Sequence, residues 1–265
     1  MSFANCDSAL LPPPFATFAT DERGSRFTVT RERTSYPAQP ALANNDVWQL
    51  YEAGDHLCLT AGVTGAARPL LRADLASDWS GGDIRVDPDA PLATQQAPVT
   101  SHLGELIVLA QLNLQAGLYV HAASVTWGED AHVLLGPSGA GKSTLSRLCE
   151  LEGATVLSDD RTVLREEGGV LYAYGTPFHG TGARWAARRV PVRAITFLAH
   201  GPATVVTPLA PLRGTAKLLS LCFTPFWSKV AVERAAETVM RLLPLAPCRT
   251  LAFTPDRSAA LALRS

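Results

Sequence analysis

A glycine-rich run is the part of this sequence whose residue types and spacing point most directly to chemistry. Residues 136–143, "GPSGAGKS", fit the pattern G-x-x-x-x-G-K-[ST]. Glycines let successive backbone N–H groups turn around a phosphate, Lys142 brings a mobile charge to the β and γ phosphates, and the Ser143 hydroxyl can bind the Mg²⁺ that bridges them. We therefore predict that ATP and Mg²⁺ are cofactors. The predicted nucleotide contacts are consecutive: Gly136, Pro137, Ser138, Gly139, Ala140, Gly141, Lys142, Ser143 and Thr144.

A pair of aspartates follows in "TVLSDD", with Asp159 17 residues after Lys142 (159 − 142). One helix of about ten residues and one returning strand fit into that distance, which brings both carboxylates back to the phosphate loop. An ATPase needs one aspartate for magnesium, whereas a phosphotransferase also needs a carboxylate to orient or deprotonate the accepting hydroxyl. We interpret Asp159 and Asp160 as functional. The alternative is a solvated turn or a helix cap.

His121 opens the run "HAASV", on the strand that precedes the strand before the phosphate loop. Its imidazole could hydrogen-bond a carboxylate and help that carboxylate act as a base, or it could be a satisfied core residue. Without further information, the residue type and position favour the core residue.

A strand, a helix and a strand must position these groups. The sequence predicts a strand at 132–136, a helix at 142–150 and a strand at 154–158. Together they form a βαβ unit with the loop at the carboxyl edge of a parallel sheet. The predicted fold class is α/β, a mixed or parallel sheet with flanking helices and a β-rich N-terminal region. Further strands are predicted at 117–127, 168–175, 192–198 and 248–254, and helices at 214–226 and 229–244.

The first part of the chain, residues 1–98, predicts short strands at 26–33, 56–63 and 83–88, separated by turn residues. Thr100 or Ser101 is then a candidate N-cap for an apolar, buried helix at 102–115. This organisation predicts a β-rich region over 1–98, integrated with the core or separate from it, and a nucleotide-binding domain over 99–265.

Composition excludes several classes of function. The formal net charge of −1 gives no field to attract nucleic acid or anionic lipid, and 47% hydrophobic with 18% charged residues is typical of a globular chain. The five cysteines are odd in number and scattered, so they indicate neither a disulfide framework nor a zinc site. No secretory leader and no membrane-spanning apolar run is recognisable. We therefore expect a cytoplasmic protein that binds neither nucleic acid nor membrane.

Taken together, "HAASV…HVLLGPSGAGKSTL…GATVLSDD" closely resembles the C-terminal kinase module of HPr kinase/phosphorylase and, more nearly, shorter HPr-kinase-like proteins, some of which phosphorylate serine in lasso-peptide precursors. The resemblance covers roughly residues 100–265. It implies a fold related to phosphoenolpyruvate carboxykinase and a serine kinase acting on a protein or peptide. It further implies that Asp159 is the base, assisted by His121, and that Ser143 and Asp160 help hold magnesium. Lys142 of the phosphate loop completes the predicted catalytic set. Since HPr kinases form hexamers, it also allows a homo-oligomer.

The sequence departs from that family after the aspartates. HPr kinase/phosphorylases have a glutamate-bearing acidic segment there, whereas residues 175–189 read "GTPFHGTGARWAARR". This difference argues against phosphorylase activity and against HPr as the substrate. Residues 175–180 form a plausible substrate or phosphate loop, with His179 and Arg184 as candidate substrate or phosphate contacts. Arg184, Arg188 and Arg189 could neutralise transferring charge. The arginines could equally form an exposed face.

Three other classes of phosphate-loop protein compete with the kinase. ABC-transporter ATPases have the same phosphate-loop sequence, but they carry an L-S-G-G-Q-like signature that this sequence lacks. Their Walker B aspartate also lies later in the chain than position 159. A small-metabolite kinase should carry an arginine-rich lid, which is not recognisable here. A nucleotide-binding ATPase or regulatory module without kinase activity stays open, because a phosphate loop binds ATP whether or not an acceptor reaches it.

Overall fold

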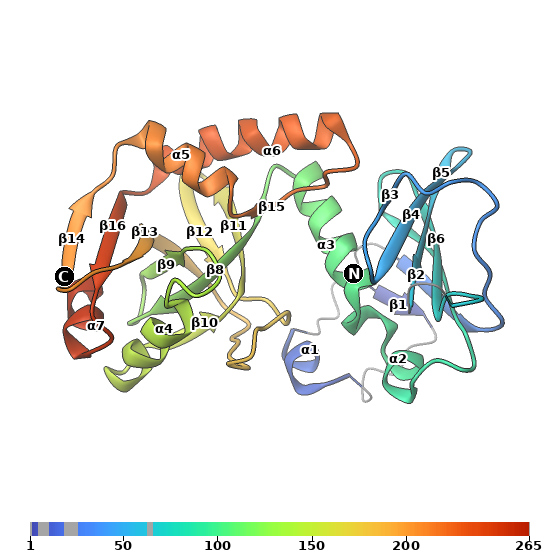
Figure 1. Cartoon of the computed structure of the whole chain (residues 1–265), viewed down its shortest axis with the longest axis horizontal. Coiled ribbons are helices and arrows are strands. Elements are labelled where there is room, and N and C mark those ends of the chain that lie inside the picture. Colours follow the sequence, from blue (N-terminus) through green and yellow to red (C-terminus); the bar gives the residue numbers. More distant parts are fainter. Residues whose placement is uncertain (1, 5–10, 19–25, 63–65, 265) are drawn as a thin grey trace. The chain divides into compact units, whose positions relative to one another are not determined.

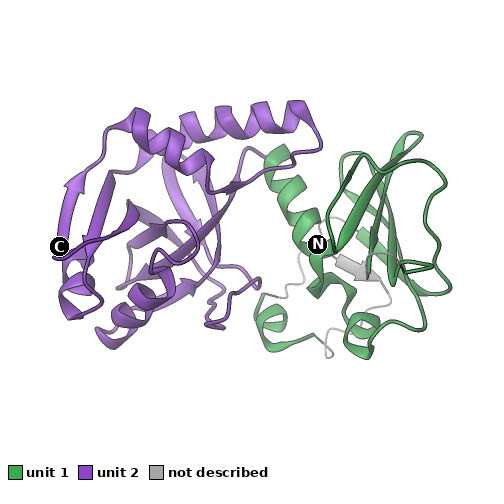
Figure 2. Cartoon of the chain, viewed as in Figure 1, with its two compact units in different colours: residues 1–114 green, residues 115–265 purple. Residues whose placement is uncertain are grey.

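The computed structural model describes residues 2–4, 11–18, 26–62 and 66–264, and the chain divides into two compact units (Figure 2). Unit 1 comprises residues 1–114 and unit 2 residues 115–265. The boundary predicted from the sequence, at 98/99, lies one helix earlier than this division.

Unit 1 contains a seven-stranded sheet (Figure 1). Its strands are β1 Ser2–Ala4, β2 Arg26–Arg31, β3 Ala43–Asn44, β4 Trp48–Ala53, β5 His56–Ala61, β6 Leu71–Ala76 and β7 Gly81–Val86. The order is β1-β2-β7-β6-β5-β4-β3, with β1–β2 and β2–β7 parallel and the other neighbours antiparallel. The predicted strands correspond to β2, β5 and β7, although residue 63 lies outside the described residues. The sequence analysis missed β4 and β6, which complete the hairpins.

The helical segments of unit 1 end with the predicted apolar helix. They are α1 Pro13–Thr17, α2 Leu92–Gln96, the 3₁₀ turn η2 Pro98–Thr100 and α3 His102–Leu114. Ser101 Oγ accepts a hydrogen bond from the Leu103 backbone N–H at 3.3 Å, so Ser101 satisfies one of the free donors at the start of α3. Leu103 and Ile107 are fully buried, which confirms the expectation of a buried helix.

Unit 2 is a mixed α/β structure with nine strands in its sheet. The strands are β8 Leu118–Thr126, β9 Ala131–Leu135, β10 Thr155–Ser158, β11 Arg161–Glu167, β12 Val170–Tyr174, β13 Arg189–His200, β14 Val205–Pro208, β15 Cys222–Phe223 and β16 Cys248–Phe253. The helical segments are α4 Lys142–Leu151, α5 Pro211–Leu219, α6 Lys229–Leu242, the 3₁₀ turn η3 Leu243–Leu245 and α7 Arg257–Arg264.

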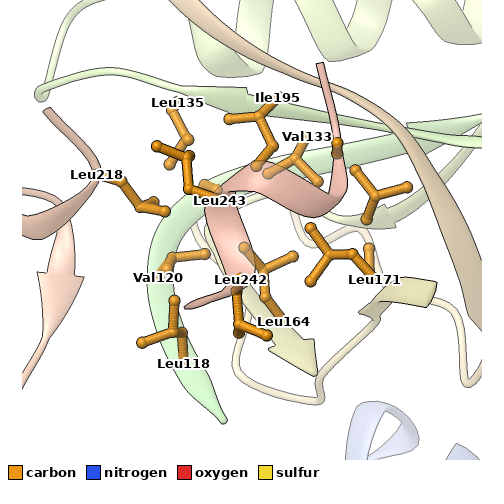
Figure 3. Packing of buried hydrophobic residues seen from close by; sticks show 14 of the residues in the cluster. Leu118, Val120, Val133, Leu135, Leu164, Leu171, Ile195, Leu218, Leu242 and Leu243 are labelled. Atoms are coloured by element: carbon orange, nitrogen blue, oxygen red, sulfur yellow. The ribbon is translucent and has the colours of Figure 1, made fainter. Parts of the chain in front are cut away.

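The helices of unit 2 cover both faces of the sheet, with α4 and α7 on one side and α5 and α6 on the other (Figure 1). Alternation along β9 explains the two layers, because successive side chains of a strand point to opposite faces. Val133 and Leu135 belong to the cluster that includes Leu242 of α6, shown in Figure 3, whereas Leu134 joins the cluster with Leu145 of α4. Unit 2 therefore has two apolar cores, one on each face.

The predicted strand–helix–strand unit is present as β9, α4 and β10, with one difference in topology. β9 runs parallel to β13, but β8 lies between β9 and β10 and is antiparallel to both. β9 and β10 therefore run in the same direction without being neighbours. Leu135 pairs with Ala122 and Ser158 with Ser124, so the carboxyl ends of both strands reach the same part of β8.

The prediction of a helix at 214–226 is wrong over the second half of that range. α5 ends at Leu219, and residues 222–223 form β15 instead, where Cys222 pairs with Val120 and Phe223 with Tyr119 of β8. Pairing with β8 satisfies backbone groups that a longer helix would have satisfied internally, so tertiary contacts override the apolar pattern here. The sequence analysis also missed β11, β14 and α7, whereas it placed α6 with an error of two residues at its end.

None of the helices in the described residues is long and apolar enough to cross a membrane. Cys58, Cys149, Cys222 and Cys248 are free thiols, and Cys6 lies outside the described residues.

Candidate functional site

The predicted phosphate loop connects the end of β9 to the start of α4. Gly139 and Gly141 have φ angles of 81° and 94°, in the left-handed region that favours glycine. A Cβ on Gly141 would lie 2.7 Å from Cζ of Phe253, the last residue of β16. Both the backbone angle and the nearby Phe253 ring therefore require glycine at position 141. The loop ends at the N-terminus of a ten-residue helix, whose free N–H groups favour an anion.

Lys142 is buried and folds back across this loop. Its Nζ donates hydrogen bonds to the carbonyl oxygens of Gly136 at 2.7 Å and Pro137 at 3.2 Å. Burial lowers the pKa of Lys142, and nearby Asp160 opposes that effect. Ser143 and Thr144, in the same helical turn, are exposed. The loop therefore presents an ammonium group and a hydroxyl group beside the backbone N–H groups of α4.

"SDD" forms the tight turn between β10 and β11, a strand that the sequence analysis did not foresee. The Ser158 hydroxyl accepts a hydrogen bond from the Arg161 N–H at 3.1 Å and donates one to the Arg161 carbonyl at 2.6 Å. These bonds fix the backbone on both sides of Asp159 and Asp160. The turn and the functional interpretation of "SDD" therefore do not exclude each other.

Asp160 pairs with His121 and with Arg161. Its Oδ1 lies 3.0 Å from His121 Nε2, and its Oδ2 accepts a hydrogen bond from the Arg161 guanidinium, which stacks on Phe223 with 4.4 Å between Cζ and the ring centroid. Burial lowers the pKa of His121, and the Lys142 charge lowers it further, so the imidazole is neutral at neutral pH. The resemblance implied that His121 assists Asp159, but the contact in the structure is with Asp160.

Asp159 is 4% exposed and lies under a loop. Its Oδ1 accepts a hydrogen bond from the Gly180 N–H at 2.8 Å, whereas its Oδ2 is buried with no hydrogen-bond partner among the described residues. A Cβ on Gly182 would lie 2.5 Å from that Oδ2. A buried carboxylate oxygen without a partner is costly, so it marks a position where another group is expected to bind.

The predicted substrate contacts His179 and Arg184 lie on the same loop, on either side of Gly180 and Gly182. The His179 ring stacks on Trp185 at a centroid distance of 5.2 Å, and its Nδ1 is 2.9 Å from the Gly180 carbonyl. Arg184 Nε contacts Glu150 Oε1 of α4 at 2.9 Å. Farther along, Arg188 donates to the Gly128 carbonyl and Arg189 pairs with Glu167.

Arg161 and Gly182 touch the aspartates, and the sequence patterns did not single them out. Arg161 is adjacent to "SDD", so its charge was a usable signal. Gly180 is 21 residues from Asp159 and ends the predicted substrate or phosphate loop at 175–180, and the two glycines of "HGTG" hinted at a close backbone approach.

The donors at this edge fit magnesium bound together with phosphates. No group of three or more His, Cys, Asp or Glu side chains in the described part of the chain is placed to hold a metal. Mg²⁺ in nucleotide sites, however, is held by one or two carboxylates or hydroxyls together with phosphate oxygens. The unpartnered Asp159 Oδ2, the carboxylate of Asp160 and the Ser143 hydroxyl are oxygen donors of that kind.

Comparison with known proteins gives a family and distant structural likenesses. Residues 96–254 match the family model of the SynChlorMet cassette protein ScmC, a range that contains every residue of the candidate site. Among solved structures, the HPr(Ser) kinase/phosphatase from Coxiella burnetii is similar, at 14% identity and a TM-score of 0.33, over 55% of this chain and 85% of that chain. A search of curated proteins found no match.

Proposed function

This chain belongs to the family of the SynChlorMet cassette protein ScmC, and on that premise we propose that it is an ATP-dependent kinase that phosphorylates a serine hydroxyl of a protein or peptide. The carrying observation is the unpartnered, buried Oδ2 of Asp159. Asp159 directly follows β10. The carboxyl ends of β10 and of β9, the strand before the phosphate loop, lie beside the same part of β8. The HPr-kinase-like motifs of the sequence favour the same activity.

The proposed nucleotide contacts are the backbone N–H groups of residues 136–144 and the side chain of Lys142. In the structure Lys142 Nζ bonds two loop carbonyls, so it is already held inside the loop that would surround the β and γ phosphates. Binding requires the ammonium to exchange a neutral carbonyl oxygen for a charged phosphate oxygen, which is a gain because both partners of the new bond are ionised.

The proposed base is Asp159. Its Oδ2 takes the proton of the serine hydroxyl while the serine oxygen forms a bond to the γ phosphorus. The bond between that phosphorus and the oxygen shared with the β phosphate breaks, and ADP leaves with the electron pair. In this structure the Gly180 N–H occupies Oδ1, so Oδ2 is the oxygen left to accept the proton.

Asp160 has a different role in this proposal. His121 and Arg161 hold its carboxylate in a fixed orientation, and together with Ser143 it would hold Mg²⁺. When bound, Mg²⁺ neutralises charge that develops on the phosphates. Arg161 places a further positive charge beside the aspartate pair.

A second candidate is a nucleotide-binding ATPase or regulatory module without kinase activity. The observation that favours it is the burial of Asp159 beneath the loop that carries Gly180 and Gly182, since no acceptor reaches the carboxylate while that loop is in place.

Two variants separate nucleotide binding from transfer. Asp159→Asn keeps the side-chain shape and an acceptor for the Gly180 N–H. We expect it to bind ATP with the affinity of the parent, measured by titration calorimetry, and to transfer phosphate about 10² to 10⁴ times more slowly, measured by the mass of the acceptor. Lys142→Ala should instead weaken ATP binding by about tenfold or more. If Asp159→Asn transfers phosphate at the parental rate, Asp159 is not the base.

A further inference from the structure

The loop above Asp159 is paired to a strand at the edge of the sheet. We name residues 177–186 the cover. β10 is an edge strand of its sheet, and the cover supplies its outer neighbour. The Ala186 N–H donates to the Leu157 carbonyl at 3.0 Å, and Trp185 forms an antiparallel bridge with Ser158.

Apolar contacts of the cover lie at its two ends, where Phe178 meets the Tyr119 ring edge-on and Ala186 packs against the core, and polar and ring contacts lie between them. Arg184 pairs with Glu150, and the His179 and Trp185 rings stack on one another. Four of its ten residues are exposed, and Ala183 has a φ of 51°, which is strained for a residue with a side chain. Segments with exposed residues and few buried apolar contacts open at a small cost in free energy.

Given the proposed kinase activity, we infer that the cover occupies the place of the acceptor polypeptide, which binds by replacing it along β10. Displacing the cover leaves the Leu157 carbonyl and Asp159 Oδ1 without their N–H donors. An extended polypeptide has N–H groups to restore both bonds, as in the addition of a strand to a sheet edge. A small metabolite has no such row of donors. The inferred acceptor is therefore an extended segment of polypeptide.

Position 182 identifies where the acceptor side chain lies. A Cβ there would be 2.5 Å from Asp159 Oδ2, closer than a carbon can approach but in the direction of that oxygen. A replacing segment that sits slightly farther out directs the side chain of the equivalent residue at Oδ2. A serine there brings its hydroxyl to the proposed base. The cover has glycine at this position, so it fills the acceptor site without a hydroxyl to phosphorylate.

The probe that tests this inference is a synthetic peptide of residues 177–186 carrying Gly182→Ser. It is titrated against three forms of the full chain: the parent, Gly182→Ala and Thr181→Ala. The added Cβ of Gly182→Ala prevents the cover from closing on Asp159. Thr181→Ala is the matched control, because it changes an exposed residue of the cover and keeps both glycines.

We expect Gly182→Ala to bind the peptide about tenfold more tightly than the parent and Thr181→Ala to bind it like the parent, because a competing cover reduces the fraction of binding-competent molecules. Hydrogen exchange should show the Gly180 amide protected in the parent and Thr181→Ala and exposed in Gly182→Ala. Glu150→Gln releases Arg184 without a steric change, and it should tighten binding by about two- to fivefold.

Equal peptide affinities in the parent, Gly182→Ala and Glu150→Gln would overturn the inference, as would a Gly180 amide that exchanges freely in the parent. The kinase activity is judged separately by adding ATP and Mg²⁺. Tighter binding to the opened variants with no phosphate on the peptide serine would support the docking site and contradict the proposed reaction.

Discussion

His132 is a second titratable residue of unit 2 whose environment fixes its charge, away from the candidate site. It lies on β9, is 3% exposed, and its Nδ1 accepts a hydrogen bond from the Arg249 guanidinium at 3.2 Å. Burial, together with the charge of Arg249, lowers the pKa of His132 to about 4. Neutral His132 is therefore part of the folded structure, because protonation would place two cations side by side in the interior.

This environment makes stability depend on pH. Between the unfolded pKa of 6.5 and the folded pKa of about 4, the unfolded chain binds the extra proton. The contribution of neutral His132 to the free energy of unfolding is thus fully present above about pH 6.5. It is lost as the pH drops towards 4, by roughly 3 kcal/mol in total. We expect urea unfolding of the parent to show this loss and His132→Gln to show a much flatter dependence from pH 6.5 to 5. Parallel curves for the two proteins would refute the assignment.

At the residue scale, local sequence predicts only part of the site. The spacing of Gly136, Lys142 and Ser143 is a complete local pattern, so the sequence suffices to place them. Asp159 and Asp160 were predicted as a pair, but two of their partners, His121 and Gly180, come from distant segments. Neither the pairing of Asp160 with His121 nor the bond from Gly180 to Asp159 follows from any local pattern, because register and loop packing decide both.

At the element scale, the phosphate loop depends on contact between two elements distant in sequence. Gly141 lies against Phe253 of β16, whereas Gly139 has open space around the position of a Cβ. Both glycines have left-handed backbone angles, so an alanine at either position carries the same kind of backbone strain. Only Gly141→Ala adds a steric collision with another element.

We expect Gly139→Ala to weaken ATP binding about 5- to 30-fold, from backbone strain of about 1–2 kcal/mol. Gly141→Ala should weaken it by about a further tenfold because the loop must also move away from Phe253. The double variant Gly141→Ala/Phe253→Leu should recover part of that difference in a calorimetric titration. Equal affinities for Gly139→Ala and Gly141→Ala would show that Phe253 does not shape the loop.

The elements themselves were predicted unevenly, for physical reasons. β9, α4 and β10 were predicted because strand, glycine loop and helix follow one another in a short stretch. β15 was missed because "LCF" is equally apolar in a helix or a strand, and its pairing partner Tyr119–Val120 is about a hundred residues away. The position of β8 between β9 and β10 is a long-range pairing, so the local pattern could not reveal it.

At the scale of the whole molecule, the family match and the division into units do not coincide. The match over residues 96–254 includes α3 of unit 1 and most of unit 2, and it leaves out all seven strands of the sheet in unit 1. The candidate site lies wholly within unit 2. The sequence predicted a β-rich first part and a nucleotide-binding second part from composition and motifs, but the hairpin pairing of unit 1 depends on strands that carry no motif.

The proposed kinase transfers phosphate from ATP to a serine rather than to water, and the products formed from ATP distinguish the two reactions. Peptides encoded beside the gene are incubated with the full chain, ATP and Mg²⁺, and the products are followed by intact-mass spectrometry and by assay of free phosphate. We expect a peptide to gain one phosphoryl group on serine with the parent chain and none with Asp159→Asn, although both bind ATP. Consumption of ATP by the parent with phosphate appearing only in solution would contradict the account.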